Sequence, residues 1–191
     1  MNKTIKHILI LIIALIAINV ISGTFYKRFD LTTDNRYTLS ESATQIIEAI
    51  ESPIRIDVFL EGEDFPSEFR RLQNETKQLL EEFAALNNNI VFNFINPLED
   101  ESTRERNIQQ LTQLGLKPMQ LSVQESGKST QAVIFPYALA SYNEQTVVIP
   151  LVKNKIGASQ QELVNNSVQN LEYTFADGFS KLTNPKRRKI A

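Results

Sequence analysis

The sequence has no cysteine and no tryptophan, and only one histidine and six glycines among its 191 residues. The absence of cysteine excludes disulfides, thiolate metal sites, a cysteine nucleophile and the lipid attachment of a lipoprotein. The single histidine, His7, lies in an N-terminal apolar region, so a histidine-based triad or zinc cluster cannot form inside a folded domain. The glycines are not clustered, and no glycine-rich loop for a nucleotide phosphate is present.

Basic residues are scarce outside the two ends of the chain. All 22 acidic residues lie at or beyond Asp30, and residues 29–191 hold 16 basic against 22 acidic residues, a net charge of −6. Without the basic run 186–189 the same region has 12 basic residues and a net charge of −10. Because this charge would repel a polyanion, nucleic acid is not expected as a partner. The length and the 42% hydrophobic content suit one buried core.

The longest apolar run covers residues 8–26 with few polar interruptions. Its 19 residues come close to the roughly 20 that a helix needs to cross a bilayer. Lys27 and Arg28 follow two aromatic residues, as in the girdle that holds a helix at the lipid headgroups. We therefore predict that residues 1–28 form an uncleaved transmembrane anchor in the lipid bilayer. A signal peptide cleaved near Thr24 is the competing interpretation, and the nearly balanced flanking charges leave the orientation open.

The segments after the anchor alternate between helix and strand patterns. Residues 29–52 are expected to form a polar lead and a short helix that Ser40 caps. Residues 54–60 have the period of two of a half-buried strand, and residues 66–86 have the spacing of an amphipathic helix. Residues 90–96 then indicate a mostly buried strand.

The second half of the chain predicts two helices and two hairpins. One helix opens with a capping box at residues 102–105, and the last helix opens with a capping box at residues 159–162. Between them lie strand patterns joined by turns at residues 126–128 and 143–144, which imply two hairpins. Pro136 and Pro150 within these strand patterns indicate edge positions or bulges.

The order of strand, helix, strand, helix, antiparallel strands and final helix predicts an α/β fold with a mixed sheet. Thioredoxin-like folds share this order, although thiol–disulfide exchange is excluded because there is no thiolate. We assign residues 53–185 to a single α/β domain and residues 186–191 to the start of a further region. The protein is thus expected to consist of an anchor, a lead and one α/β domain.

Acidic clusters are the remaining candidates for chemistry. Glu61, Glu63 and Asp64 lack the ligand spacing of a calcium loop, and the acidic run 99–101 is expected to favour the start of the helix that follows it. The neighbouring pair Glu81–Glu82 diverges by about 100° on a helix and cannot form a catalytic carboxylate pair. We predict no catalytic, cofactor-binding or metal-binding residue, and no enzyme activity.

Three segments carry a family resemblance: FDLTTDNRYTLSESATQIIEAIESPIRIDVFL, FNFINP and ELVNNSVQNLEYTFADGFSKLTNPKRRKIA. Together they make residues 26–191 similar to the N-terminal part of gliding-motility-associated ABC transporter auxiliary proteins of the GldG type, and VNNSVQNLEY is the most specific block. The resemblance implies a non-catalytic subunit of an ABC transporter complex, anchored in the inner membrane with its α/β domain in the periplasm. Its implied partners are a separate ATPase and a separate multi-span permease. Family members continue into a second α/β region and a C-terminal membrane helix.

A second interpretation belongs to another functional class. It is a periplasmic domain that binds a sugar, a peptide or a cell-wall fragment in a pocket between the hairpins and the last helix. Tyr137, Tyr142 and Tyr173 are its candidate contact residues, because a tyrosine offers an apolar ring and one polar group. A hydrolase that uses Asp or Glu is the third and least supported interpretation.

Overall fold

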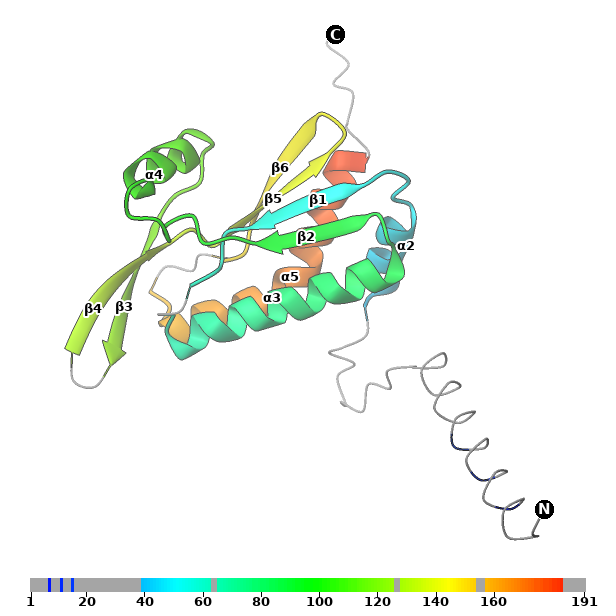
Figure 1. The fold of residues 1–191 in the computed structure, drawn as a ribbon, viewed down its shortest axis with the longest axis horizontal. Coiled ribbons are helices and arrows are strands. Elements are labelled where there is room, and N and C mark those ends of the chain that lie inside the picture. The colour runs from blue at the N-terminus through cyan, green and yellow to red at the C-terminus, as the bar shows by residue number, and fades with distance from the viewer. Residues whose placement is uncertain are drawn as a thin grey trace. The chain divides into compact units, whose positions relative to one another are not determined.

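The computed structural model describes residues 39–62, 65–125, 128–153 and 157–183, together with His7, Leu11 and Leu15 (Figure 1). The chain divides into two compact units, Met1–Thr38 and Leu39–Ala191. The three described residues of the first unit are helical and exposed. The rest of the predicted anchor, the lead up to residue 38 and the basic run 186–189 lie outside the described residues. In the described part of the chain, no helix has both the length and the apolar character needed to cross a membrane.

A four-stranded mixed sheet forms the centre of the second unit. The strand order is β2-β1-β5-β6, in which β1 runs parallel to β2 and antiparallel to β5, and β5 runs antiparallel to β6. The predicted α/β class and mixed sheet are therefore confirmed. The strands are β1 (Ile54–Val58), β2 (Ile90–Phe94), β5 (Tyr137–Tyr142) and β6 (Gln145–Pro150).

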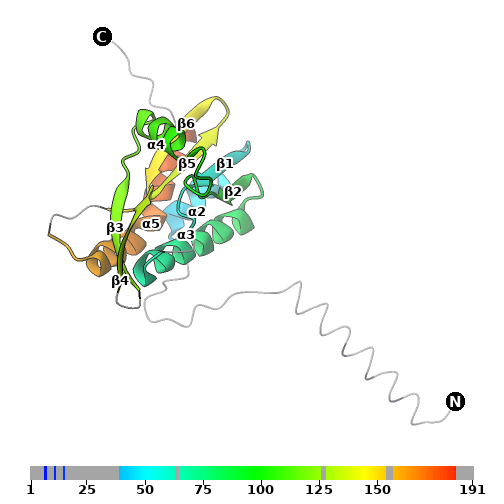
Figure 2. The same cartoon turned by 60° about the vertical axis from the view of Figure 1, so that its left-hand side comes forward.

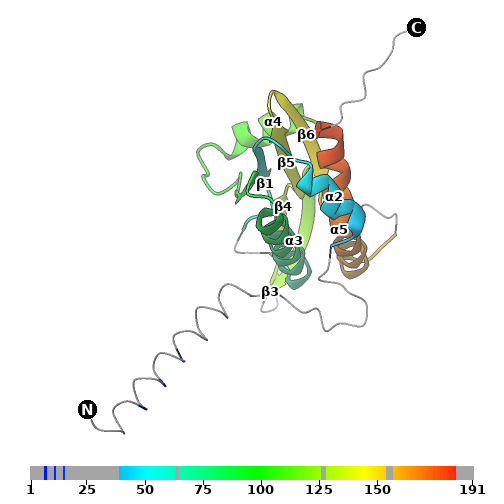
Figure 3. The same ribbon diagram turned by 90° about the vertical axis from the view of Figure 1, so that its right-hand side faces the viewer.

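Three helices cover one face of this sheet (Figure 3), and together with it they enclose the main core. The core forms because apolar residues recur on one side of each helix, and the rings of Phe83, Phe175 and Phe179 meet edge-on or tilted between α3 and α5. The predicted helices are confirmed, and the short first helix packs against the other two. They are α2 (Glu41–Glu48), α3 (Ser67–Leu86) and α5 (Gln160–Thr183).

Two asparagines join the end of α3 to the end of α2. The side-chain amide of Asn87 donates to the carbonyl oxygens of Ile47 and Ile50, at 2.8 and 2.9 Å, and Asn89 donates to Ile50 at 3.0 Å. These bonds satisfy the carbonyl of Ile50 and add a donor to the carbonyl of Ile47, which also accepts from the backbone N–H of Ile50 at 3.2 Å. The asparagine run that ends the predicted helix therefore also fixes α2 in the core.

The opposite face of the sheet is covered at one end by α4 (Arg104–Gln113). A second, smaller core forms there from Leu111, Leu116 and Phe135, with Tyr137 and Leu139 of β5 packed against it. These β5 residues alternate with Ala138 and Ala140, which face the main core, because successive side chains of a strand point to opposite faces.

A hairpin made of β3 (Met119–Glu125) and β4 (Lys128–Ile134) forms a separate two-stranded sheet (Figure 2). Pro136 follows it and separates β4 from β5, so the strand pattern over residues 131–142 is divided between two sheets. Both predicted hairpins are confirmed. The turn at 143–144 includes Asn143, whose φ of 53° suits its small polar side chain, while the other turn falls partly outside the described residues.

Two details differ from the sequence prediction. β2 was expected to be mostly buried, but it lies at the edge of the sheet and Val91 is 52% exposed. The capping box expected at residues 102–105 does not form, because Asp100 accepts hydrogen bonds from both the backbone and the hydroxyl of Ser102. The capping box at Ser159 and Glu162 does form, with reciprocal bonds of 3.0 and 3.3 Å.

Candidate functional site

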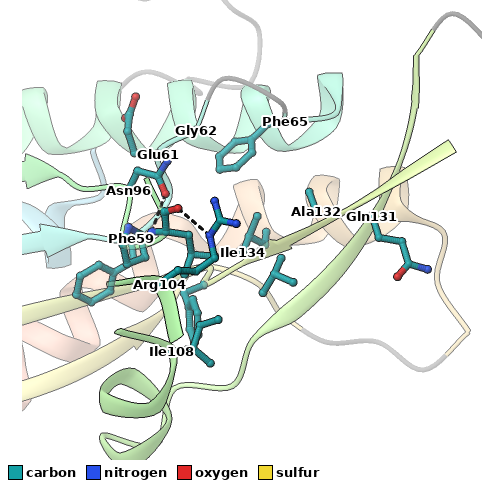
Figure 4. A pocket seen from close by; sticks show the side chains of 14 residues that line it. Phe59, Glu61, Gly62, Phe65, Asn96, Arg104, Ile108, Gln131, Ala132 and Ile134 are labelled. Carbon is teal, nitrogen blue, oxygen red and sulfur yellow. Dashed lines mark hydrogen bonds between the residues drawn. The ribbon is translucent and has the colours of Figure 1, made fainter. Parts of the chain in front are cut away.

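A cavity of about 340 Å³ opens where β1 and β2 end (Figure 4). We call it the strand-end cavity. Its walls come from the segments that follow β1 and β2, from α4 and from the last part of β4. The residues that line it are Phe59, Glu61, Gly62, Phe65, Asn96, Pro97, Leu98, Arg104, Ile108, Gln131, Ala132, Val133, Ile134 and Phe135.

The parallel pairing of β1 and β2 explains why the cavity forms at this place. The ladder ends with Val58 opposite Phe94, and Ile95 then donates to the carbonyl of Val58 at 2.9 Å. Beyond this point both chains leave the sheet at the same edge, one toward α3 and the other toward α4. Crevices outside the carboxyl ends of parallel strands are the usual ligand sites of open α/β sheets.

Apolar side chains form most of the wall. Phe65 is 7% exposed, and Ile134 is 4% exposed. Gly62 permits a close approach of the Phe65 ring, since a Cβ on Gly62 would lie 2.7 Å from its Cε1 atom. Phe59, Leu98 and Ile108 are half-buried and complete the apolar surface, which favours burial of an apolar group.

Hydrogen bonds hold three of the polar side chains that line the cavity, those of Glu61, Asn96 and Arg104. Glu61 accepts from the side-chain amide of Gln73 at 2.8 Å. The Nε of Arg104 donates to the carbonyl of Leu98 at 3.1 Å, and the side chain of Asn96 accepts from the backbone of Leu98 at 3.0 Å (Figure 4). The rim therefore offers one oriented carboxylate and one oriented guanidinium.

The cavity meets β4 along the edge of the strand. Five successive residues, 131 to 135, line it, and no residue of β3 does. Because neighbouring side chains in a strand point to opposite faces, an unbroken run of lining residues indicates contact with the strand's edge. The other edge of β4 pairs with β3, so this edge is the one without a strand partner in the described part of the chain.

The acidic residues singled out in the sequence separate into different roles. Glu61 lines the strand-end cavity, whereas Glu63 and Asp64 lie outside the described residues. Asp100 belongs to the turn before α4, where hydrogen bonds from Ser102 hold the pKa of its carboxyl below the ordinary value. Glu81 and Glu82 lie on α3 away from the cavity. In the described part of the chain, no cluster of three or more His, Asp or Glu side chains could hold a metal ion.

The three candidate tyrosines do not come together. Tyr137 faces the smaller core under α4, and Tyr142 packs against the main core on the opposite face of the sheet. Tyr173 lies on α5 and is 73% exposed. None of the three lines the strand-end cavity, so the pocket expected between the hairpins and the last helix does not involve them jointly.

Sequence reasoning did not identify most of the cavity residues. Phe59 lies near the end of the first predicted strand and Leu98 shortly after the second, and these positions were the available signal, because chain segments that leave parallel strands meet at one edge. Arg104 gave no signal, since an arginine at the start of a helix is common on protein surfaces. The part of the cavity wall that β4 forms could not be predicted from the sequence, because it depends on where the β3-β4 hairpin lies in the tertiary structure.

A protein family described as a domain of unknown function, DUF7088, matches residues 33–141, more than half of the chain. The chain belongs to the DUF7088 family. The matched range of the DUF7088 domain runs from just before α2 almost to the end of β5, and it includes every residue that lines the strand-end cavity. No curated protein and no solved structure matches the chain.

Proposed function

We propose that this DUF7088 protein is a non-catalytic, membrane-anchored auxiliary subunit of an ABC transporter complex associated with gliding motility. Its α/β domain would lie in the periplasm and dock partner subunits, namely the permease and, through the assembly, the ATPase. The proposal is supported by the resemblance of residues 26–191 to GldG-type proteins and by the apolar run 8–26 with its basic flanks. Its anchor would lie in the inner membrane.

The strand-end cavity is the observation that carries the docking role. It combines an apolar wall with a free strand edge and with polar side chains that already have hydrogen-bond partners. Such a surface can bind another chain through backbone pairing and side-chain burial. Among the residues that the structure describes, Glu61 is the only carboxylate that lines it, and general acid–base chemistry on a glycosidic bond requires two.

We further propose that the α/β domain has a thioredoxin-like fold. The supporting features are the parallel β1-α3-β2 unit, the antiparallel β5-β6 pair that follows it in the sheet order, and the packing of α5 on the same face as α3. Because the chain has no cysteine, the domain would serve binding instead of thiol exchange.

Purification of the tagged full chain from detergent-solubilised membranes tests this function. We expect a permease and an ATPase to co-purify, and we expect protease added to spheroplasts to digest residues 39–183. Recovery of neither partner, or protection of the domain from the protease, would contradict the proposal. A chain with the tag but without residues 39–183 is the control for binding through the anchor alone.

A periplasmic domain that binds a small ligand is the second candidate. It is favoured by the cavity volume of about 340 Å³, which lies in the range of small-molecule sites, about 300–1,000 Å³. A thermal-shift screen with sugars, peptides and cell-wall fragments tests it, because a ligand of the native state raises the unfolding temperature by mass action. A shift that disappears when Ala132→Trp fills the cavity would favour this candidate.

A further inference from the structure

We infer that the strand-end cavity binds an extended peptide segment of a partner protein. The segment pairs with the free edge of β4, buries an apolar side chain in the cavity and places a basic residue beside Glu61. This inference deepens the docking function proposed above and rests on it, because it assigns the docking site and the chemistry of the segment that occupies it.

The first argument is the geometry of β4. Over residues 131–134 the strand presents an edge to the cavity while its other edge pairs with β3. In a strand that is paired on one side, about half of the backbone N–H and C=O groups point away from the partner strand. An added strand would pair with these groups, which a compact solute cannot do along the whole edge.

The second argument is the apolar space next to this edge. Phe65 and Ile134 are almost fully buried, and Figure 4 shows them on two sides of the cavity with Ile108 on a third. A strand paired with β4 would direct alternate side chains to one face. Since the wall on this face is apolar, the inserted side chain is expected to be aliphatic or aromatic.

The third argument is charge. Glu61 is exposed and accepts a hydrogen bond from the neutral side-chain amide of Gln73. Among the described residues, no Lys or Arg forms an ion pair with it. By contrast, the guanidinium of Arg104 lies 3.9 Å from the carboxylate of Glu101. Residues 39–183 contain 11 basic and 20 acidic residues, a net charge of −9. A basic segment would therefore be attracted to the domain and would balance the charge of Glu61.

The experiment starts from a random octapeptide display library, selected on the full chain in lipid nanodiscs. We expect enrichment of proline-poor sequences that combine a β-branched or aromatic residue with Lys or Arg. Failure to enrich any sequence, or enrichment of acidic or proline-rich sequences, would overturn the inference. The most enriched peptide then serves as the labelled probe for affinity measurements by fluorescence anisotropy.

Two substitutions and one control locate the binding site. Ala132→Trp fills the cavity and is expected to weaken binding about tenfold or more, the effect of losing at least 1.4 kcal/mol. Glu61→Gln is expected to weaken binding several-fold at low salt and less at high salt. Val148→Trp is the control and should leave binding unchanged, because Val148 is an exposed residue of β6 that does not line the cavity. Equal loss in the control and in Ala132→Trp would overturn the inference.

Hydrogen exchange on the unmodified chain covers the case in which a cavity variant fails to fold. The bound peptide should slow the exchange of those amides within residues 131–135 that face the cavity, while the amides of α5 keep their rates. Unchanged exchange along β4 in the presence of bound peptide would overturn strand pairing.

The outcomes also separate this inference from the proposed function. If Ala132→Trp loses peptide binding but no permease or ATPase co-purifies with the unmodified chain, the peptide site is supported and the transporter role is contradicted. If both subunits co-purify with Ala132→Trp as well as with the unmodified chain, the transporter role is supported and the assigned docking site is contradicted.

Discussion

At the scale of single residues, the side chain of Asn87 connects the end of α3 to the end of α2. Its side-chain NH₂ group donates hydrogen bonds to two carbonyls at the end of α2, and its side-chain oxygen accepts from the backbone N–H of Asn89 at 2.9 Å. The neighbouring Asn88 is exposed. One asparagine of the run therefore joins two helices, while the next one only continues the turn.

We expect Asn87→Ala to lower the free energy of unfolding by about 2 kcal/mol, because it removes two hydrogen bonds to part-buried carbonyls and leaves the backbone N–H of Asn89 without its acceptor. Chemical denaturation followed by circular dichroism measures the change. Asn88→Ala is the matched control, with an expected effect within about 0.5 kcal/mol. Equal effects of the two substitutions would show that the bonds of Asn87 contribute nothing specific.

Asp100 supplies a prediction about pH. Hydrogen bonds from the hydroxyl and the backbone of Ser102 hold its pKa below the ordinary value of 3.8, and the positive charge of Arg106 lowers the pKa further. Because the folded-state pKa is the lower one, the stability that these bonds provide is present above the unfolded-state pKa. It is lost as the pH falls through the folded-state pKa.

Carboxyl NMR titration of Asp100 checks this prediction. Ser102→Ala removes the largest cause and should raise the pKa toward its ordinary value. Added salt should change the pKa less than the substitution does, since a hydrogen bond is screened less than the charge of Arg106. An unchanged pKa in Ser102→Ala would refute the assignment.

At the scale of elements, α5 packs closely on β6 at Gly178. A Cβ at this position would lie 2.8 Å from the Cδ1 and 2.9 Å from the Cγ1 of Ile149. The glycine therefore lets the helix approach the strand, and this close contact helps to hold α5 over the sheet.

We expect Gly178→Val to reduce the free energy of unfolding by about 1–3 kcal/mol through overpacking. Ile149→Ala should offset part of this loss in the double variant, so that the two changes are less harmful together than their sum predicts. Tyr173→Val on the exposed side of the same helix is the control. Strictly additive effects would argue against a direct contact.

Capping shows how far an element can be predicted from local sequence. Ser159 and Glu162 form the expected box because they lie three residues apart in one turn, where the Ser159 hydroxyl and backbone reach the backbone and carboxylate of Glu162. At residues 102–105 the same pattern fails, since Asp100 is nearer in the chain and takes both donors of Ser102. The sequence pattern therefore predicts where a helix begins, but nearby hydrogen-bond acceptors decide whether the capping box forms.

At the scale of the whole molecule, the membrane anchor remains a prediction. We expect the full chain to stay in the membrane pellet after alkaline carbonate extraction, and a chain without residues 1–28 to appear in the supernatant. Replacing the basic run 186–189 with alanines is the control and should not release the protein. A mature chain that begins near Thr24 and diffuses freely would contradict the prediction.

The sequence by itself determined the helices and strands, because their signals are local: a period of two in residues 54–60, helical spacing in residues 66–86, and caps such as Ser40. These signals also sufficed for the mixed sheet, since strands joined by tight turns pair antiparallel and strands joined through a helix pair parallel. The tertiary structure alone decided that β2 lies at an edge and that Tyr137 and Tyr142 face opposite sides of the sheet. It also decided the strand-end cavity, because Phe59, Leu98 and Ala132 are far apart in the chain and meet only where three segments converge.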